Sequence, residues 1–157
     1  MAVGVGQLAP EFNLFDTDKK AKTLADFSGK NKVIAFFPGA FTGVCTKEMC
    51  EFRDSMANLN NLNAEVLGVS VDGVFSNKAF AAQNNLQFTV LSDYRREAVK
   101  AYGVELNDFA GLPGYVAAKR SIFVLDKSNV VRYAWISDNP GVEPNYAEIS
   151  QALSALK

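Results

Sequence analysis

Lys32-Val-Ile-Ala-Phe-Phe37 runs into Pro38-Gly39, and a helical pattern begins a few residues later. The first run is apolar, β-branched and aromatic, which is typical of a strand buried on both faces of a mostly parallel sheet. Pro-Gly ends such a strand. Apolar side chains then recur at helical spacing over residues 46–57. The order predicts a buried strand whose carboxyl end leads through a loop into a helix.

Strands and helices also alternate on both sides of this unit. We expect strands at residues 11–15, 65–71, 87–91, 121–125 and 130–136, and helices at residues 76–84, 95–102 and 145–156. Ser76 is placed to cap its helix and Gly103 to close the next one. Residues 126–129 have the composition of a hairpin loop. The order predicts an α/β fold with a central mixed β-sheet flanked by helices.

The connection over residues 104–119 is long and carries several apolar side chains, among them Phe109. Loops of this length inside a compact domain usually serve a function. Three roles stay open for it: a wall around a site, a dimer contact, or a segment folded back onto its own core.

Length and charge indicate a single globular domain, residues 1–157. Sixteen Lys plus Arg against seventeen Asp plus Glu leave a net charge of −1, which gives no electrostatic attraction for nucleic acid or for an anionic membrane. No apolar run approaches the roughly 20 residues of a membrane helix, and the first residues lack the pattern of a signal peptide. We therefore expect a cytoplasmic protein with no nucleic-acid or membrane partner.

The chain contains no histidine. Ser-His-Asp triads, Cys-His dyads and His-ligated zinc or iron are therefore excluded within one chain. The two cysteines, Cys45 and Cys50, are too few for a thiolate zinc site or a disulfide-rich scaffold. We expect no metal and no other cofactor, so catalysis at neutral pH would fall to a cysteine, a carboxylate, a lysine or a tyrosine.

Cys45 stands at the junction of the loop and the helix. A thiol in the first turn of a helix faces unpaired backbone N–H groups and the positive end of the helix dipole, which favour the thiolate. Because the thiolate is the nucleophile, this position makes Cys45 a candidate nucleophile. The alternative is a buried structural cysteine, since free cysteines are often buried.

The stretch Pro38-Gly-Ala-Phe-Thr42-Gly-Val-Cys45 matches the Pro-x-x-x-Thr-x-x-Cys signature of the peroxiredoxins. Further blocks of the chain also resemble that family, in order, from residue 6 to the last helix: Gly6-Gln-Leu-Ala-Pro10, Thr46-Lys-Glu48, Phe52-Arg-Asp54, Leu91-Ser-Asp93, Ala101-Tyr-Gly103 and Arg120-Ser-Ile-Phe-Val-Leu-Asp126. The resemblance implies a thioredoxin-like fold and a thiol-dependent peroxidase that reduces hydrogen peroxide and organic hydroperoxides.

The resemblance also implies roles for single residues. Cys45 is the peroxidatic cysteine, which attacks a peroxide oxygen and becomes a sulfenic acid. Arg120 supplies a permanent cation and a fork of donors for the peroxide oxygens. Thr42 offers its hydroxyl to the peroxide, and Pro38 shields the thiolate from water without a competing N–H.

Each of these residues has a structural alternative. Thr42 is placed to cap the helix that carries the cysteine, Pro38 is placed to end the strand, and Arg120 has the setting of an ordinary surface arginine. Glu48 is expected to support the site by holding Arg120 or Arg53 in an ion pair, rather than by transferring protons.

Cys50 follows Cys45 by five residues. An intact helix separates two such Cα atoms by about 8.6 Å, whereas a disulfide needs about 4.4–6.8 Å. The spacing resembles the bacterioferritin-comigratory subgroup, in which the second cysteine resolves the sulfenic acid as an intramolecular disulfide, so the helix must then unwind. The residues around Cys45 also resemble the one-cysteine and type-five subgroups, which leave Cys50 as core packing.

A peroxidase of this kind needs an electron donor. The resemblance implies a thioredoxin or glutaredoxin-like dithiol, or an external thiol in the one-cysteine case, acting on a monomer or homodimer. The sequence has no dinucleotide fingerprint and no C-x-x-C pair. The missing C-x-x-C argues against a thiol–disulfide oxidoreductase, and a non-enzymatic redox sensor or holdase is the remaining alternative.

Overall fold

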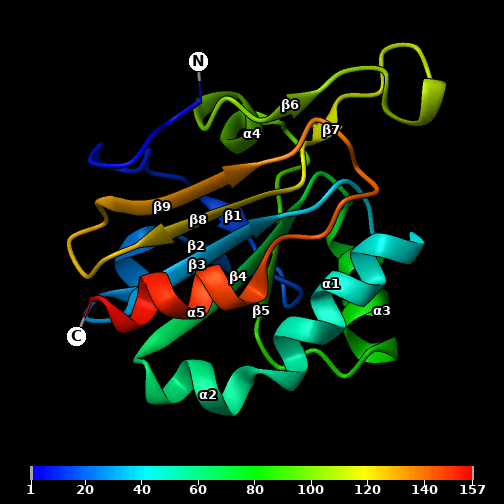
Figure 1. Cartoon of the computed structure of the whole chain (residues 1–157). Helices are drawn as coiled ribbons and strands as arrows, with labels where there is room; N and C mark the ends of the chain where they lie inside the picture. Colours follow the sequence, from blue (N-terminus) through cyan, green and yellow to red (C-terminus); the bar gives the residue numbers. More distant parts are fainter. Residues whose placement is uncertain (1, 157) are drawn as a thin grey trace.

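The computed structural model describes residues 2–156. Its described residues form a seven-stranded sheet with helices on both faces (Figure 1). The elements follow one another as β1 (Leu14–Phe15), β2 (Ala21–Lys22), the 3-10 helix η1 (Leu24–Phe27), β3 (Asn31–Phe36), α1 (Gly43–Asp54), α2 (Met56–Asn61), β4 (Ala64–Ser70), α3 (Val74–Gln83), β5 (Thr89–Ser92), α4 (Glu97–Ala101), β6 (Glu105–Leu106), η2 (Phe109–Gly111), β7 (Ala117–Ala118), β8 (Ser121–Leu125), β9 (Val131–Ile136) and α5 (Tyr146–Ser154).

The strand order is β2-β1-β5-β4-β3-β8-β9. Strands β3, β4 and β5 are parallel, while β8 runs antiparallel to β3 and β9 antiparallel to β8. The predicted central mixed sheet is therefore confirmed. Because β3, β4 and β5 are parallel, their carboxyl ends share one edge of the sheet, and the loop after β3 begins there.

The central strand β3 separates two hydrophobic cores. Its even positions, such as Ile34, face a core with α4 and the N-terminal segment. Its odd positions, such as Val33, face a core with α1, α3 and α5. The side chains of β3 are buried on both faces, as the apolar run predicts, because successive side chains of a strand point to opposite faces.

Several predicted boundaries are wrong. The expected strand at residues 11–15 is reduced to Leu14–Phe15. The expected helix at residues 46–57 starts earlier, at Gly43, and is divided at Ser55 into α1 and α2. Ser76 does not cap α3, because that helix already begins at Val74 with Gly73 as its N-cap.

The helix expected at residues 95–102 is shortened by its surroundings. Arg96 adopts a left-handed backbone conformation with φ of 60°, so α4 begins at Glu97. The carboxylate of Asp93 accepts hydrogen bonds from the backbone N–H groups of Ala98 and Val99. A side chain upstream of the helix thus satisfies its first donors, and Gly103 closes the turn after it with a positive φ of 71°.

The remaining connections are of the type that the sequence predicts. Residues 126–129 join β8 to β9 as a hairpin loop, with the Asp126 N–H donating to the Val130 carbonyl. Asn145 caps α5 by accepting from the Glu148 N–H. The long connection contains η2 and the short hairpin β6–β7, whose Ala117 and Ala118 are buried in the core that α4 shares (Figure 1). Within residues 2–156, no helix has the length and apolar character to span a membrane.

Candidate active site

Cys45 is the third residue of α1 and is fully buried. The buried strand β3 delivers the chain to the carboxyl edge of the sheet, and Pro38 through Thr42 turn it into the helix. Thr42 occupies the N-cap position. The Cys45 side chain therefore lies in the first turn of a twelve-residue helix, where unpaired N–H groups and the helix dipole place positive charge.

Arg120 contacts the sulfur directly. It precedes β8, whose Ser121 is paired with Phe36, so the antiparallel register brings it beside the end of β3. Its Nη2 donates to Cys45 Sγ at 3.1 Å, and Nε and Nη2 both donate to the Pro140 carbonyl, at 3.2 and 2.7 Å. Arg120 is only 1% exposed. The surface-arginine alternative is therefore wrong.

Glu48 completes this charged cluster from one helical turn beyond Cys45. Its Oε1 accepts from Arg120 Nη1 at 2.7 Å, and both side chains are buried. Its Oε2 has no hydrogen-bond partner among the described residues. Burial raises the pKa of Glu48 to about 7, although Arg120 acts to lower it. Arg53, the other predicted partner, instead donates to Asp54.

The same contacts act on the guanidinium. Burial works against the positive charge of Arg120, but the nearby Glu48 and Cys45 outweigh it and raise the pKa of Arg120 above its ordinary value. Arg120 therefore stays a cation while it is buried. One cation is shared between a carboxylate and a sulfur.

Thr42 and Pro38 lie at the mouth of the site. The Thr42 hydroxyl donates to the Gly39 carbonyl at 2.7 Å and makes no capping bond to the helix. Thr42 therefore occupies the N-cap position, as the capping alternative predicts, but its hydroxyl does not cap the helix. A hydroxyl that donates one bond keeps acceptor capacity. Pro38 is buried, lines the same cavity and presents no N–H to it.

These residues surround one cavity of about 220 Å³. The residues that line it come from the loop before α1, from the first turn of α1 and from three segments that are distant in the sequence. They are Pro38, Thr42, Gly43, Val44, Cys45, Phe109, Arg120, Pro140 and Gly141. Phe109 comes from η2, so the long connection supplies a wall of the cavity. Pro140 and Gly141 were not foreseen from the sequence, because Pro140 acts through its backbone carbonyl, which no side-chain pattern reveals.

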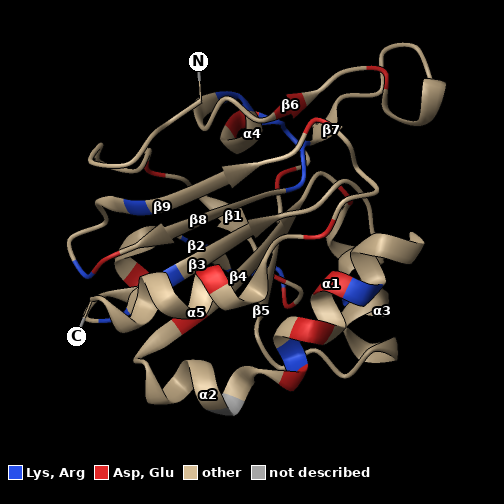
Figure 2. Cartoon of the chain, in the orientation of Figure 1, with Lys and Arg blue, Asp and Glu red and all other residues tan. Residues whose placement is uncertain are grey.

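Cys50 lies outside this cavity. It occupies the same uninterrupted helix as Cys45, and both cysteines are free. Its thiol is partly buried and lies 3.6 Å from Asn84 Oδ1. The two sulfurs are therefore unbonded on an intact helix. Charged residues of both signs occur along this helix (Figure 2).

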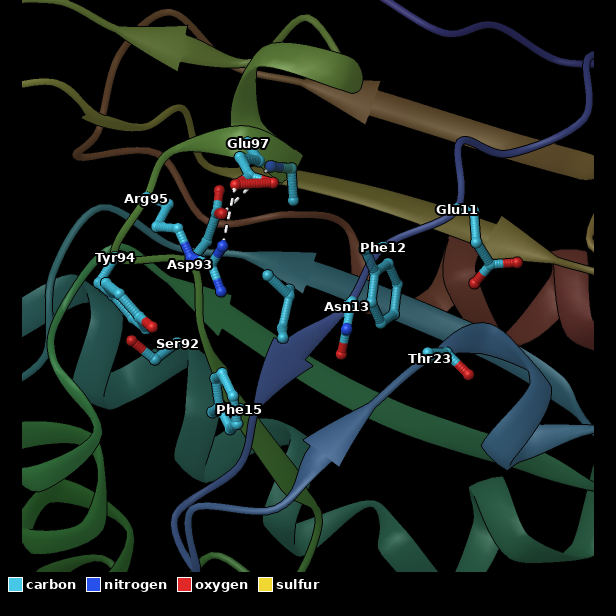
Figure 3. Close-up of a pocket in the computed structure, with 12 residues that line it drawn as sticks. Glu11, Phe12, Asn13, Phe15, Thr23, Ser92, Asp93, Tyr94, Arg95 and Glu97 are labelled. Carbon is cyan, nitrogen blue, oxygen red and sulfur yellow. Dashed lines mark hydrogen bonds and ion pairs between the residues drawn. The ribbon is translucent and has the colours of Figure 1, made fainter.

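A larger cavity of about 330 Å³ lies between β1, Thr23 and the segment from β5 to α4 (Figure 3). Two of its carboxylates hold backbone N–H groups: Glu11 accepts from the Leu24 N–H, and Asp93 accepts from the first turn of α4. No cysteine lines it. Of these two cavities, the smaller one brings a cysteine and a buried arginine together.

The fold and this cavity define an α/β protein with a cysteine-centred site. Residues 5–134 match the model of the family described as AhpC/TSA family. The chain therefore belongs to the AhpC/TSA family, and its predicted resemblance to the peroxiredoxins is confirmed.

Curated relatives agree with this assignment. The chain is 42% identical over 133 residues to "Peroxiredoxin Q, chloroplastic" of Triticum aestivum, which covers 85% of this chain and 59% of the relative. It is 42% identical over 155 residues to the protein of the same name from Arabidopsis thaliana, covering 99% of this chain and 68% of the relative. The chain thus spans less than two thirds of the wheat protein.

A solved structure supports the fold. The crystal structure of peroxidoxin BcpB from Mycobacterium tuberculosis aligns with a TM-score of 0.84 at 27% identity, covering 98% of this chain and 97% of that one. The likeness confirms the predicted thioredoxin-like architecture.

Proposed function

We propose that this protein is a thiol-dependent peroxidase that reduces hydrogen peroxide and organic hydroperoxides through Cys45. The observation that carries the proposal is the 3.1 Å contact between Arg120 Nη2 and Cys45 Sγ at the first turn of a helix. A guanidinium and a helix start both favour negative charge on sulfur, and the thiolate is the reactive form.

In the proposed reaction, the Cys45 thiolate attacks one peroxide oxygen. A sulfur–oxygen bond forms while the oxygen–oxygen bond breaks, which leaves Cys45 as a sulfenic acid. The electron pair departs with the other oxygen as hydroxide or alkoxide, which takes a proton to give water or an alcohol. The Arg120 fork, which contacts the Cys45 sulfur, would donate to the oxygen on which this charge develops. Thr42 supplies a further polar group, and Pro38 limits water.

Cys50 would then resolve the sulfenic acid. Its sulfur attacks the Cys45 sulfur, the sulfur–oxygen bond breaks, and water leaves as the disulfide forms. A thioredoxin or glutaredoxin-like dithiol would reduce this disulfide. The five-residue spacing of Cys45 and Cys50, which resembles the bacterioferritin-comigratory subgroup, favours this arrangement over the alternative, in which an external thiol reduces a one-cysteine enzyme.

In this proposal, residues 1–157 form one domain that acts as a monomer or homodimer in the cytoplasm. A single sheet that carries both hydrophobic cores supports the one-domain assignment. The names of the wheat and Arabidopsis relatives place those proteins in the chloroplast. Fractionation of the source cells tests the compartment, and sedimentation tests the oligomeric state.

A coupled peroxidase assay tests the activity. The parent protein should consume hydrogen peroxide continuously with thioredoxin and its reductase, whereas Cys45→Ser should consume none while keeping its circular dichroism spectrum. Ser is near-isosteric but offers no accessible anion. Turnover retained by Cys45→Ser would overturn the proposed nucleophile. Oxidation of the parent without turnover by any thiol donor would favour the redox sensor.

A further inference from the structure

The end of α3 holds the face of α1 that carries Cys50. Asn84 follows α3 as its C-cap residue. Its Oδ1 accepts from the Cys50 thiol at 3.6 Å, and its backbone carbonyl accepts from Arg53 Nη1 at 2.7 Å. Its Nδ2 donates to the Phe80 carbonyl at 3.0 Å, which fixes the amide with its oxygen toward the sulfur. One residue thus binds α1 at two points.

These contacts belong to the helical state alone. Five residues of intact helix keep the Cα atoms of Cys45 and Cys50 about 8.6 Å apart, beyond the roughly 4.4–6.8 Å of a disulfide. Cys50 must therefore leave the Asn84 amide before it can reach Cys45. Only a thiol that carries its proton donates this hydrogen bond, so the contact is also lost when the thiolate forms.

We infer that Asn84 is a positioning residue that restrains Cys50 and thereby sets how fast the Cys45 sulfenic acid becomes a disulfide. The inference rests on the proposed function. Two reactions compete for the sulfenic acid: attack by the Cys50 sulfur, which expels water, and oxidation by a second peroxide, which adds an oxygen and gives the sulfinic acid. A tighter hold on Cys50 shifts the outcome toward the sulfinic acid.

Two substitutions separate this role from that of a helix cap. Asn84→Ala and Asn84→Asp both lose the Nδ2 donor to the Phe80 carbonyl. Ala also removes the acceptor for the Cys50 thiol, whereas Asp replaces it with a charged acceptor that binds a donor more strongly and attracts Arg53. The restraint on Cys50 therefore weakens in Asn84→Ala and tightens in Asn84→Asp. Gln83→Ala, at an exposed neighbour on the same helix, is the matched control.

The measurement is a single turnover with one equivalent of hydrogen peroxide, quenched by a thiol-blocking reagent and analysed by mass. Asn84→Ala should form the Cys45–Cys50 disulfide roughly threefold to tenfold faster than the parent, the range for one lost hydrogen bond. Asn84→Asp should form it more slowly. At high peroxide, the sulfinic fraction should fall in the first variant and rise in the second, while Gln83→Ala matches the parent.

The results that would contradict the role of Asn84 can be distinguished from those that would contradict the resolving role of Cys50. Equal rates in the parent and both variants, or changes in the same direction, overturn the role of Asn84 and leave the peroxidase proposal intact. A parent that consumes peroxide without forming the disulfide overturns the resolving role of Cys50, and the inference with it. Should Asn84→Ala fail to fold, as judged by circular dichroism, the slower disulfide expected of Asn84→Asp still decides the question.

Discussion

At the scale of single residues, the site depends on how one buried cation is shared. Arg120 donates to Cys45 Sγ, to Glu48 and to the Pro140 carbonyl. A planar fork satisfies these partners together, whereas an ammonium is a point charge on a flexible stem. The arrangement therefore requires an arginine specifically.

Arg120→Lys should slow the reaction of Cys45 with hydrogen peroxide by roughly tenfold to a hundredfold, the effect of one lost charge-assisted hydrogen bond. Stopped-flow mixing under single-turnover conditions measures this second-order rate. Arg132→Lys, at an exposed arginine paired with Asp126, serves as the control and should react like the parent. A parental rate in Arg120→Lys would assign the activation of Cys45 to other groups.

Glu48 should give the protein a specific pH dependence of stability. Burial raises its pKa from 4.5 to about 7, so the folded protein keeps a proton that the unfolded chain releases between these values. This contribution to stability is complete below about pH 4.5 and is lost as the pH rises through 7. A pKa difference of about 2.5 corresponds to about 3 kcal/mol.

Urea unfolding of the parent and of Glu48→Gln across this pH range isolates the effect, because Gln does not titrate. The free energy of unfolding of the parent should fall relative to that of the variant between about pH 4.5 and 7, and the difference should then stay constant. A difference that is the same at every pH would contradict the buried, proton-binding carboxyl.

At the scale of elements, α1 carries both cysteines and is held from two sides. Lys47 pairs with Glu143 at 3.1 Å, and Arg53 bonds to Asn84. The periodicity of Met49 and Phe52 predicts this helix, and both side chains are buried in its core face. Its start at Gly43 was missed, because the first turn carries no apolar repeat and is set by the loop at the sheet edge.

Oxidation should unwind the start of α1, since the disulfide cannot form on an intact helix. Amide hydrogen exchange across residues 46–53 should therefore become faster in the peroxide-treated protein, while β3, β4 and β5 keep their protection. Cys50→Ser, which forms no such disulfide, is the control. Unchanged exchange in the oxidised parent would show that both cysteines remain on the helix.

At the scale of the whole molecule, the central sheet could be predicted from the sequence and its margins could not. The buried strands are marked by continuous apolar runs such as residues 32–37. The two-residue strands β2, β6 and β7 are too short to show a periodicity, and β1 is predicted only as part of a longer strand at residues 11–15. The start of α4 depends on Asp93 and on the left-handed Arg96, which are consequences of tertiary structure.

The residues of the candidate site also differ in how far their positions could be predicted from the sequence. Pro38, Thr42 and Cys45 occur in one short stretch, so their proximity follows from the sequence itself. Arg120 lies 75 residues from Cys45, and its place beside the sulfur was predicted only through the family resemblance. The Pro140 carbonyl was missed, since a backbone acceptor brought in after β9 leaves no signal in the sequence.

The mass of the protein after one equivalent of hydrogen peroxide tests the central claim most directly. The parent should lose two hydrogens and both blockable thiols, with a peptide that links Cys45 to Cys50, and Cys50→Ser should gain a single oxygen on Cys45. A parent in which Cys45 stays unoxidised would contradict the peroxidase. A parent that shows only a sulfenic acid or a bridge between chains would contradict the resolving role of Cys50.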